Sequence, residues 1–196
     1  IEILDKLLWW IKNGIVLKII IMIMLHKCVA IGGVPATGKT TLMKKILTKF
    51  TYQNFKFGLL RGHFIKEKNL VIMGIYNNDI FCGTDKLSMA VNQDFIKYVK
   101  LNKRNILFEG DRLFSLNNIK FIKELYKTRT IILENDENTL NNRHKERNDN
   151  QSAKFLKGRI TKISNILNYF DDIELKTLKN IDESNILAKK IIEYFK

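Results

Sequence analysis

Eight residues near the start of the chain constrain the fold more than any other stretch. Gly33 to Thr40 reads G-V-P-A-T-G-K-T and fills every fixed position of the Walker A pattern. An apolar run typical of a buried parallel strand, HKCVAIGG, precedes it, and the following TTLMKKILTKF places Leu42, Ile46 and Leu47 on one helical face. A strand, a glycine-rich turn and a helix in this order predict a phosphate-binding loop.

Each position of this loop has an expected task. Gly33 and Gly38 let backbone N–H groups curl around a phosphate without a Cβ in the way. Lys39 supplies a positive charge to the outer phosphates, the Thr40 hydroxyl can hold Mg²⁺, and the helix N-terminus adds its partial positive charge. The residues expected to bind ATP are Gly33, Val34, Pro35, Ala36, Thr37, Gly38, Lys39, Thr40 and Thr41.

Length and charge bound the remaining possibilities. The 196 residues suffice for one α/β domain with a sizeable core and are too few for two. The net charge of +14 points to a polyanionic partner such as DNA, although a nucleotide-binding enzyme also needs several cations. The chain has two cysteines, Cys28 and Cys82, which make no disulfide framework or metal cluster and fit a reducing cytoplasm.

The first 25 residues read least like part of a domain. Their longest apolar run, Ile15 to Leu25, is interrupted by Lys18 and falls short of the roughly 20 residues that a bilayer span needs. No small-residue cleavage site follows it, so we expect neither a membrane segment nor a signal peptide. We expect residues 1–25 to form an extension outside the domain, with Met22 or Met24 as the natural start and the preceding segment either upstream sequence or an added helix. Residues 26–196 are expected to form a single domain.

Strand-like and helical patterns alternate along the rest of the chain. NFKFGLLRG and NLVIMGIY are interpreted as two short strands separated by HFIKEK, forming a hairpin or lying side by side. Further strands are expected in RNILFEGDR, TRTIILEN and IELKTLKN, with helices between them; SLNNIKFIKELYK opens with a Ser cap. This alternation predicts an α/β fold of three layers, with a mainly parallel sheet covered by helices on both faces.

Two acids follow the buried strand NILF. Glu109 directly ends the apolar run, and Asp111 comes after a glycine that permits a sharp turn. One of them should hold Mg²⁺ beside Thr40, with Glu109 the candidate ligand, and Asp111 should then face the acceptor. Spacing does not decide between them, and simple capping of the turn is the alternative.

A polar loop, FCGTDKLSM, offers candidate groups for the acceptor. Asp85 could accept a proton from a substrate hydroxyl, Lys86 could neutralise a phosphate, and Thr84 could contact the substrate. Ordinary capping of the next helix by Asp85 or Ser88 explains the same residues equally well.

A basic stretch later in the chain, RHKERNDNQSAKFLKGR, is predicted to belong to a lid formed by residues 136–160. Arg143 and Arg147 are four residues apart on a predicted helix, so both guanidinium groups project from one face and suit a phosphoryl group in transfer. A solvated helical face would look similar. The basic residues around this pair are His144, Lys145, Lys154, Lys157 and Arg159.

The order of these motifs along the chain is similar to that of a known protein superfamily. A Walker A loop, EGDR after a strand, and Arg-x-x-x-Arg resemble the P-loop kinase superfamily, in particular the thymidylate and other nucleoside monophosphate kinases. MGIYNNDIFCGTDKLSM and NQSAKFLKGRITKISNI are similar to bacteriophage P-loop kinases such as the hydroxymethyluracil DNA kinases. Thymidylate kinases carry an acid, Arg and an aromatic residue at the strand end, whereas this chain has Asp111, Arg112 and Leu113 after Glu109 and Gly110. The resemblance implies a kinase fold with an Arg-bearing helical lid, and ATP with Mg²⁺ as cofactors.

Three functions follow from these patterns. We expect a kinase that transfers the γ-phosphoryl group of ATP to a nucleotide-type acceptor, with a hydroxymethylated pyrimidine base in DNA favoured by the resemblance and the charge. The first alternative is a (deoxy)nucleoside monophosphate kinase, in which Arg61 and Arg112 bind the existing phosphate. The second is a nucleic-acid-dependent P-loop ATPase, which the charge also fits. A GTPase is set aside because no Asn-Lys-x-Asp follows a strand.

Overall fold

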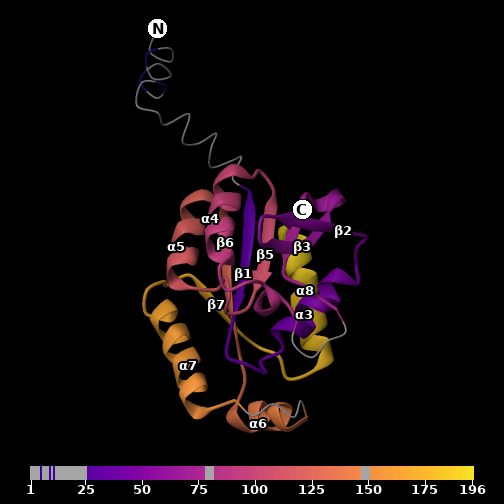
Figure 1. Cartoon of the computed structure of the whole chain (residues 1–196), viewed down its shortest axis with the longest axis vertical. Coiled ribbons are helices and arrows are strands. Elements are labelled where there is room, and N and C mark those ends of the chain that lie inside the picture. The colour runs from indigo at the N-terminus through magenta and orange to yellow at the C-terminus, as the bar shows by residue number, and fades with distance from the viewer. Residues whose placement is uncertain (1–4, 6–8, 10, 12–25, 78–81, 147–150) are drawn as a thin grey trace.

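A seven-stranded sheet between two layers of helices forms the body of the protein. The computed structural model describes residues 5, 9, 11, 26–77, 82–146 and 151–196. The strands lie in the order β2-β3-β4-β5-β1-β6-β7 (Figure 1). The predicted α/β class, with a mainly parallel sheet in three layers, is confirmed.

Five of the strands run parallel. They are β1 (Lys27–Gly32), β4 (Leu70–Met73), β5 (Asn105–Glu109), β6 (Lys127–Glu134) and β7 (Ile173–Thr177). β1 lies at the centre between β5 and β6, and all but one of its residues are buried. A parallel strand covered on both faces reads as a continuous apolar run, which explains why these segments were recognisable in the sequence.

Alternate residues of the central strand feed two separate apolar cores. Val29 and Ile31 face α3 (Lys39–Leu47) and α8 (Ile181–Tyr194), which pack against each other. Cys28 and Ala30 face the opposite layer, α4 (Val91–Leu101) and α5 (Leu116–Leu125). Figure 1 shows these two pairs of helices on opposite sides of the sheet.

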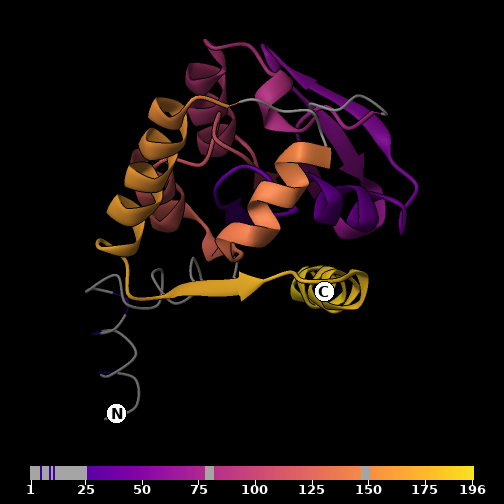
Figure 2. The ribbon, with the colours of Figure 1, turned by 90° about the horizontal axis from the view of Figure 1, so that it is seen from below.

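Two further helices extend from the body. α7 (Ala153–Leu167) packs on α5, and its Ile166 is buried in the α4–α5 core. α6 (Glu137–Glu146) buries none of its residues. Figure 2, which turns the molecule by 90°, separates α6 and α7 from β7 and α8. Among the described residues of the segment predicted to form a lid, 136–160, none is buried.

Capping residues set several helix starts. Ser115 accepts a hydrogen bond from the backbone N–H of Asn118, which confirms the predicted cap of α5. Ser152 caps α7 and Asn180 caps α8 in the same way. Such a cap satisfies one of the backbone donors that the first helical turn leaves without a partner.

The edge of the sheet differs from the sequence interpretation. NFKFGLLRG is not one strand, because it contains the turn between two strands, β2 (Gln53–Phe57) and β3 (Leu60–Ile65), which form a hairpin. β3 then pairs antiparallel with β4. The turn works because Gly58 adopts a φ of +56° and the N–H of Leu59 donates to the Asp94 carboxylate at 2.8 Å. Part of the linker predicted at HFIKEK belongs to β3, and a 3₁₀ turn, η1 (Lys66–Lys68), completes it.

Other predictions concern residues near the start of the chain and the two thiols. Most of residues 1–25 lie outside the described residues, so the predicted extension stays a prediction. None of the helices in the described ranges combines the length and apolar character needed to cross a bilayer. Cys28 and Cys82 are both buried and free of disulfides.

Candidate active site

The glycine-rich turn lies at the carboxyl end of the central strand. β1 ends at Gly32, and α3 begins at Lys39. Gly33 has a φ of +136°, and a Cβ there would lie 2.3 Å from the backbone oxygen of Leu133. Gly38 has a φ of +96° at the start of α3. Both positions require glycine for their backbone conformation, and at Gly33 close packing requires it as well.

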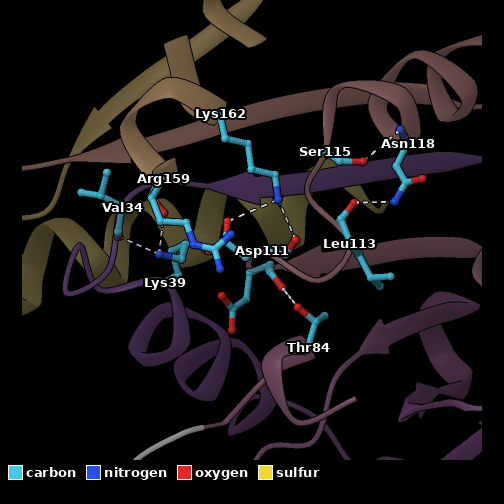
Figure 3. Close-up of polar contacts among 11 residues, drawn as sticks. Val34, Lys39, Thr84, Asp111, Leu113, Ser115, Asn118, Arg159 and Lys162 are labelled. Carbon is cyan, nitrogen blue, oxygen red and sulfur yellow. Dashed lines mark hydrogen bonds and ion pairs between the residues drawn. The ribbon is translucent and has the colours of Figure 1, made fainter. Parts of the chain in front are cut away.

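The loop is closed by its own side chains. Lys39 Nζ donates to the backbone oxygens of Gly33 and Val34 at 2.8 Å each (Figure 3). Thr37 Oγ1 donates to the Val34 oxygen at 2.9 Å. These bonds hold the loop in a compact ring with the Lys39 ammonium at its centre.

Glu109 lies beside this loop because β5 pairs directly with β1. Ile31 is opposite Glu109 in the register, so the strand-end acid reaches the first turn of α3. Thr40 Oγ1 donates to Glu109 Oε1 at 3.2 Å, and the hydroxyl of Tyr76 lies 3.5 Å from the same oxygen. Glu109 is only 2% exposed, and this burial raises its pKa to about 7 against the opposing effect of the Lys39 charge.

Asp111 faces a different neighbour. Its carboxylate is 2.6 Å from Arg159 Nε and 3.4 Å from Lys162 Nζ, and Lys162 also donates to the Asp111 backbone oxygen at 2.7 Å. Figure 3 shows both cations reaching from α7 toward Asp111. Of the two strand-end acids, Glu109 therefore lies next to Thr40, and Asp111 ties α7 to the end of β5.

The polar loop before α4 contributes one carboxylate to the site. It forms a 3₁₀ turn, η2 (Thr84–Lys86), anchored by Thr84 Oγ1, which donates to the Glu109 backbone oxygen at 2.5 Å. Partial enclosure by protein raises the pKa of Asp85, with a further rise from the negative charge of Asp111. Lys86 is exposed, and its Nζ lies 3.5 Å from Asn77 Oδ1.

These groups surround one cavity of about 560 Å³. Its volume falls in the range of small-molecule sites. Its wall is formed by charged groups of both signs, residues of the glycine-rich loop and four uncharged side chains from elsewhere in the fold. The lining residues are Pro35, Ala36, Gly38, Lys39, Thr40, Cys82, Asp85, Met89, Glu109, Asp111, Arg112, Gln151, Phe155 and Arg159.

Arg112 and Arg61, predicted together to bind an acceptor phosphate, lie apart. Arg112 lines the large cavity, where it contacts the Met89 sulfur and donates to the Asp85 backbone oxygen at 3.3 Å. Arg61 does not line it. Arg61 sits in the β2–β3 hairpin and donates to the backbone oxygens of Gly58 and Leu60, so its guanidinium stabilises that turn.

Arg143 also lies elsewhere than expected. Its guanidinium donates to the backbone oxygens of Ala36 at 3.1 Å and Leu178 at 2.8 Å, which joins α6, the glycine-rich loop and the β7–α8 connection. It borders a second cavity of about 300 Å³ instead of the large one. That cavity is lined by Gly38, Thr41, Lys45, Arg143, Glu146, Leu178, Lys179, Asn180, Ile181 and Ser184. Arg147, its predicted partner, lies outside the described residues.

The inward face of α7 was missed by the sequence interpretation. Arg159 was assigned only to the basic surround, and Phe155 and Lys162 were assigned no role. A signal was present: Phe155, Arg159, Lys162 and Ile166 follow the i, i+4, i+7, i+11 spacing of one helical face. Only the position of α7 beside the end of β5 shows what that face contacts.

A complete metal site is not built by protein side chains alone. Among the described residues, no group of three or more His, Cys, Asp or Glu side chains could hold a metal ion. Thr40 and Glu109 offer two oxygen ligands. This fits Mg²⁺, which usually binds one or two carboxylates and completes its shell with waters and substrate phosphates.

Comparison with known proteins identifies no family. The chain matches no protein-family model and no curated protein. Among solved structures, one described as "Crystal structure of APE1195" is similar, with a TM-score of 0.43 and 14% sequence identity over 88% of this chain and 98% of that one. A likeness at this level does not identify a function.

Proposed function

We propose that the protein is a P-loop kinase, a phosphotransferase that moves the γ-phosphoryl group of ATP to a nucleotide-type acceptor. One observation carries the proposal. The glycine-rich loop and Glu109 meet through the Thr40 hydroxyl, and both open into the cavity that holds Asp85, Asp111 and Arg159. This arrangement supports the proposal because the residues that would hold a phosphate, a metal ion and an acceptor all line one cavity.

ATP, the proposed phosphoryl donor, would extend across both cavities. Gly38 borders the two of them, so phosphates held by the loop and the start of α3 can lie between a base in the smaller cavity and an acceptor in the larger one. Arg143 and the four residues Leu178 to Ile181 line the smaller cavity. Arg143 would then orient the loop and border the donor base.

Thr40 and Glu109 would hold Mg²⁺. When bound, the ion would neutralise charge on the donor phosphates. The protein's part is to keep the Thr40 hydroxyl and the Glu109 carboxylate together, which the pairing of β1 with β5 accomplishes. Lys39 would leave the loop oxygens to meet the outer phosphates.

The acceptor would enter between α7 and the η2 turn. Asp85 lines the cavity, and the raised pKa of this carboxylate makes it a stronger base for a substrate hydroxyl than an ordinary aspartate. Arg112 and Arg159 supply positive charge on the same wall. A hydroxymethylated pyrimidine in DNA is the favoured acceptor, with the net charge of +14 suiting a nucleic-acid backbone.

The proposal includes the predicted lid, which residues 136–160 would form. α6 and the start of α7 border the two cavities through Arg143, Phe155 and Arg159. Closure of these helices over bound ATP would exclude water from the transfer. Arg147 keeps its predicted role as a cation for the transferring phosphoryl group.

The test is a transfer assay with γ-labelled ATP and Mg²⁺. Parallel reactions contain each deoxynucleoside monophosphate, unmodified DNA, or DNA that carries hydroxymethyluracil. Label in the modified DNA supports the favoured acceptor, and label in a nucleoside diphosphate supports the monophosphate kinase. Release of inorganic phosphate that is stimulated by DNA, without labelled acceptor, would support the nucleic-acid-dependent ATPase. No turnover of ATP under any of these conditions would refute the proposal.

A further inference from the structure

One face of α7 carries a buried apolar residue near its end, charged residues before it, and an exposed aromatic residue near its start. Ile166 is fully buried in the core, whereas Lys162 and Arg159, one and two turns earlier on the same face, bind Asp111. Phe155 is the next residue along this face. It is 40% exposed because the large cavity, and not the core, lies in front of it.

The Phe155 ring rests on a charged group that is itself fixed. The Arg159 guanidinium carbon lies 4.4 Å from the centre of the ring, and Arg159 Nε is 2.6 Å from the Asp111 carboxylate. An aromatic ring packed on an anchored guanidinium is a flat surface with little freedom to turn. Because Phe155 is 40% exposed and lines the large cavity, part of the ring surface remains accessible to an incoming group.

A second apolar side chain reaches the same cavity from a different element. Met89, in the turn before α4, is 80% exposed, lines the cavity and contacts Arg112 through its sulfur. Single exposed apolar residues are ordinary on protein surfaces. Here two of them, each beside an arginine, border one cavity that is otherwise rich in charge.

Apolar surfaces backed by guanidinium groups suit one class of ligand. Nucleobases stack on aromatic rings and arginine planes, and the phosphates attached to them attract the same arginines. A base inside a duplex is covered on both faces by its neighbours, so this type of contact requires a free nucleotide, a single strand or a flipped base.

We propose that Phe155, with Met89 nearby, forms a stacking site for an unpaired nucleobase of the acceptor. The proposal rests on the proposed function and deepens it, because it names the part of the acceptor that is recognised. Arg112 and Arg159 meet the phosphate groups of the same acceptor. Stacking contributes to binding whether or not phosphoryl transfer follows.

The test uses 2-aminopurine, whose fluorescence falls when the base stacks on a ring. Three probes are titrated with the full chain in the absence of ATP: the 2-aminopurine deoxyribonucleoside monophosphate, a single-stranded oligonucleotide with one 2-aminopurine, and its duplex. We expect quenching with the free nucleotide, the single strand or both, and weaker binding to the duplex. Phe155→Leu should weaken the quenched complex about tenfold, the scale of one lost base–ring contact, and Phe155→Tyr should retain it.

Tyr169→Leu is the matched control. Tyr169 is 55% exposed just beyond the end of α7, outside the residues that line the cavity, so this change should leave quenching and affinity unaltered. Melting curves of each variant check that the fold persists. Quenching that is identical in wild type and Phe155→Leu would overturn the stacking site, and so would a duplex that binds as tightly as the free nucleotide or the single strand.

The two proposals fail separately. Quenching that depends on Phe155, together with no transfer of label from ATP, would leave the base site standing and remove the kinase. Transfer of label from ATP, together with no effect of Phe155→Leu on quenching, would support the kinase and rule out the base site. The probe that is bound also identifies the source of the base, a free nucleotide or a nucleic acid.

Discussion

Glu109 should make the stability of the protein fall as the pH rises. Burial raises the pKa of this carboxyl group from its ordinary value of 4.5 to about 7 in the folded chain. The folded state therefore holds the proton more tightly than the unfolded state, and folding is favoured at low pH. This contribution is complete below pH 4.5 and is lost as the pH rises through 7.

The size of the effect follows from the difference between the two pKa values. Each pKa unit corresponds to about 1.4 kcal/mol, so the full change amounts to about 3 kcal/mol, of which about 2 to 3 falls between pH 5 and pH 8. That is a large share of the ~5–15 kcal/mol that stabilises an ordinary domain.

Glu109→Gln isolates this group. Glutamine has nearly the same shape, can accept from the Thr40 hydroxyl, and does not titrate. Urea unfolding of both proteins at pH 5, 6, 7 and 8, in the presence of a chelator, gives the free energy of unfolding at each pH. The variant should gain about 2 to 3 kcal/mol relative to wild type across this range, because all other titrating groups are common to both.

A difference between the two proteins that stays constant from pH 5 to pH 8 would refute the reasoning. It would mean that Glu109 titrates as in the unfolded chain and that its side chain is not enclosed as described. Addition of Mg²⁺ with ATP supplies a further check, since a cation beside Thr40 should favour the ionised carboxylate and flatten the wild-type profile.

Three other sets of variants test separate parts of the structure. Lys39→Ala should abolish phosphoryl transfer, because this lysine acts on phosphate charge. It should also cost about 1 to 3 kcal/mol of stability, because the backbone oxygens of Gly33 and Val34 lose their donor. Near-normal turnover would show that the loop takes no part in the transfer. Arg143→Ala should raise the KM for ATP and cost about 1 to 3 kcal/mol of stability, because two backbone oxygens lose their donor. A loss confined to kcat would instead support the predicted action of Arg143 on the transferring phosphoryl group. Gly32→Ala should destabilise the protein by about 1 to 3 kcal/mol, since the added Cβ would lie 2.1 Å from the Phe114 ring. Gly158 lies in a helix, and a Cβ added there would have no atom within 4 Å, so Gly158→Ala should stabilise the protein by about 0.5 to 1 kcal/mol. Denaturant unfolding that ranks these two glycine variants the other way would contradict the packing described around β1 and α7.

Much of the architecture was predictable because local signals agree with the fold. The buried strand before Gly33, the cap at Ser115 and the strand that ends at Glu109 each carry a pattern of their own, and all three are found at the predicted positions. The β2–β3 hairpin was missed because its turn depends on Gly58 and on a carboxylate from α4, a contact distant in sequence.

Side-chain direction was the least predictable property of the candidate site. Arg61, Arg143 and Arg159 are all cations near motifs, and nothing in their local sequence separates them. In the structure, the first binds its own turn, the second binds the glycine-rich loop and the third binds Asp111. The spacing of charges on a helix indicates a shared face, but only the packing of that helix determines which cavity the face meets.

If the protein transfers phosphoryl groups as proposed, the hydrogen bonds of Lys39 would affect how soon the spent nucleotide leaves. The backbone oxygens of Gly33 and Val34 hold its ammonium at 2.8 Å, so an arriving phosphate exchanges one set of partners for another and does not meet a bare charge. After the proposed transfer, when ATP has lost one phosphate, the same oxygens would compete for the ammonium. We expect this internal competition to disfavour retention of the spent nucleotide, so that the loop resets itself between turnovers.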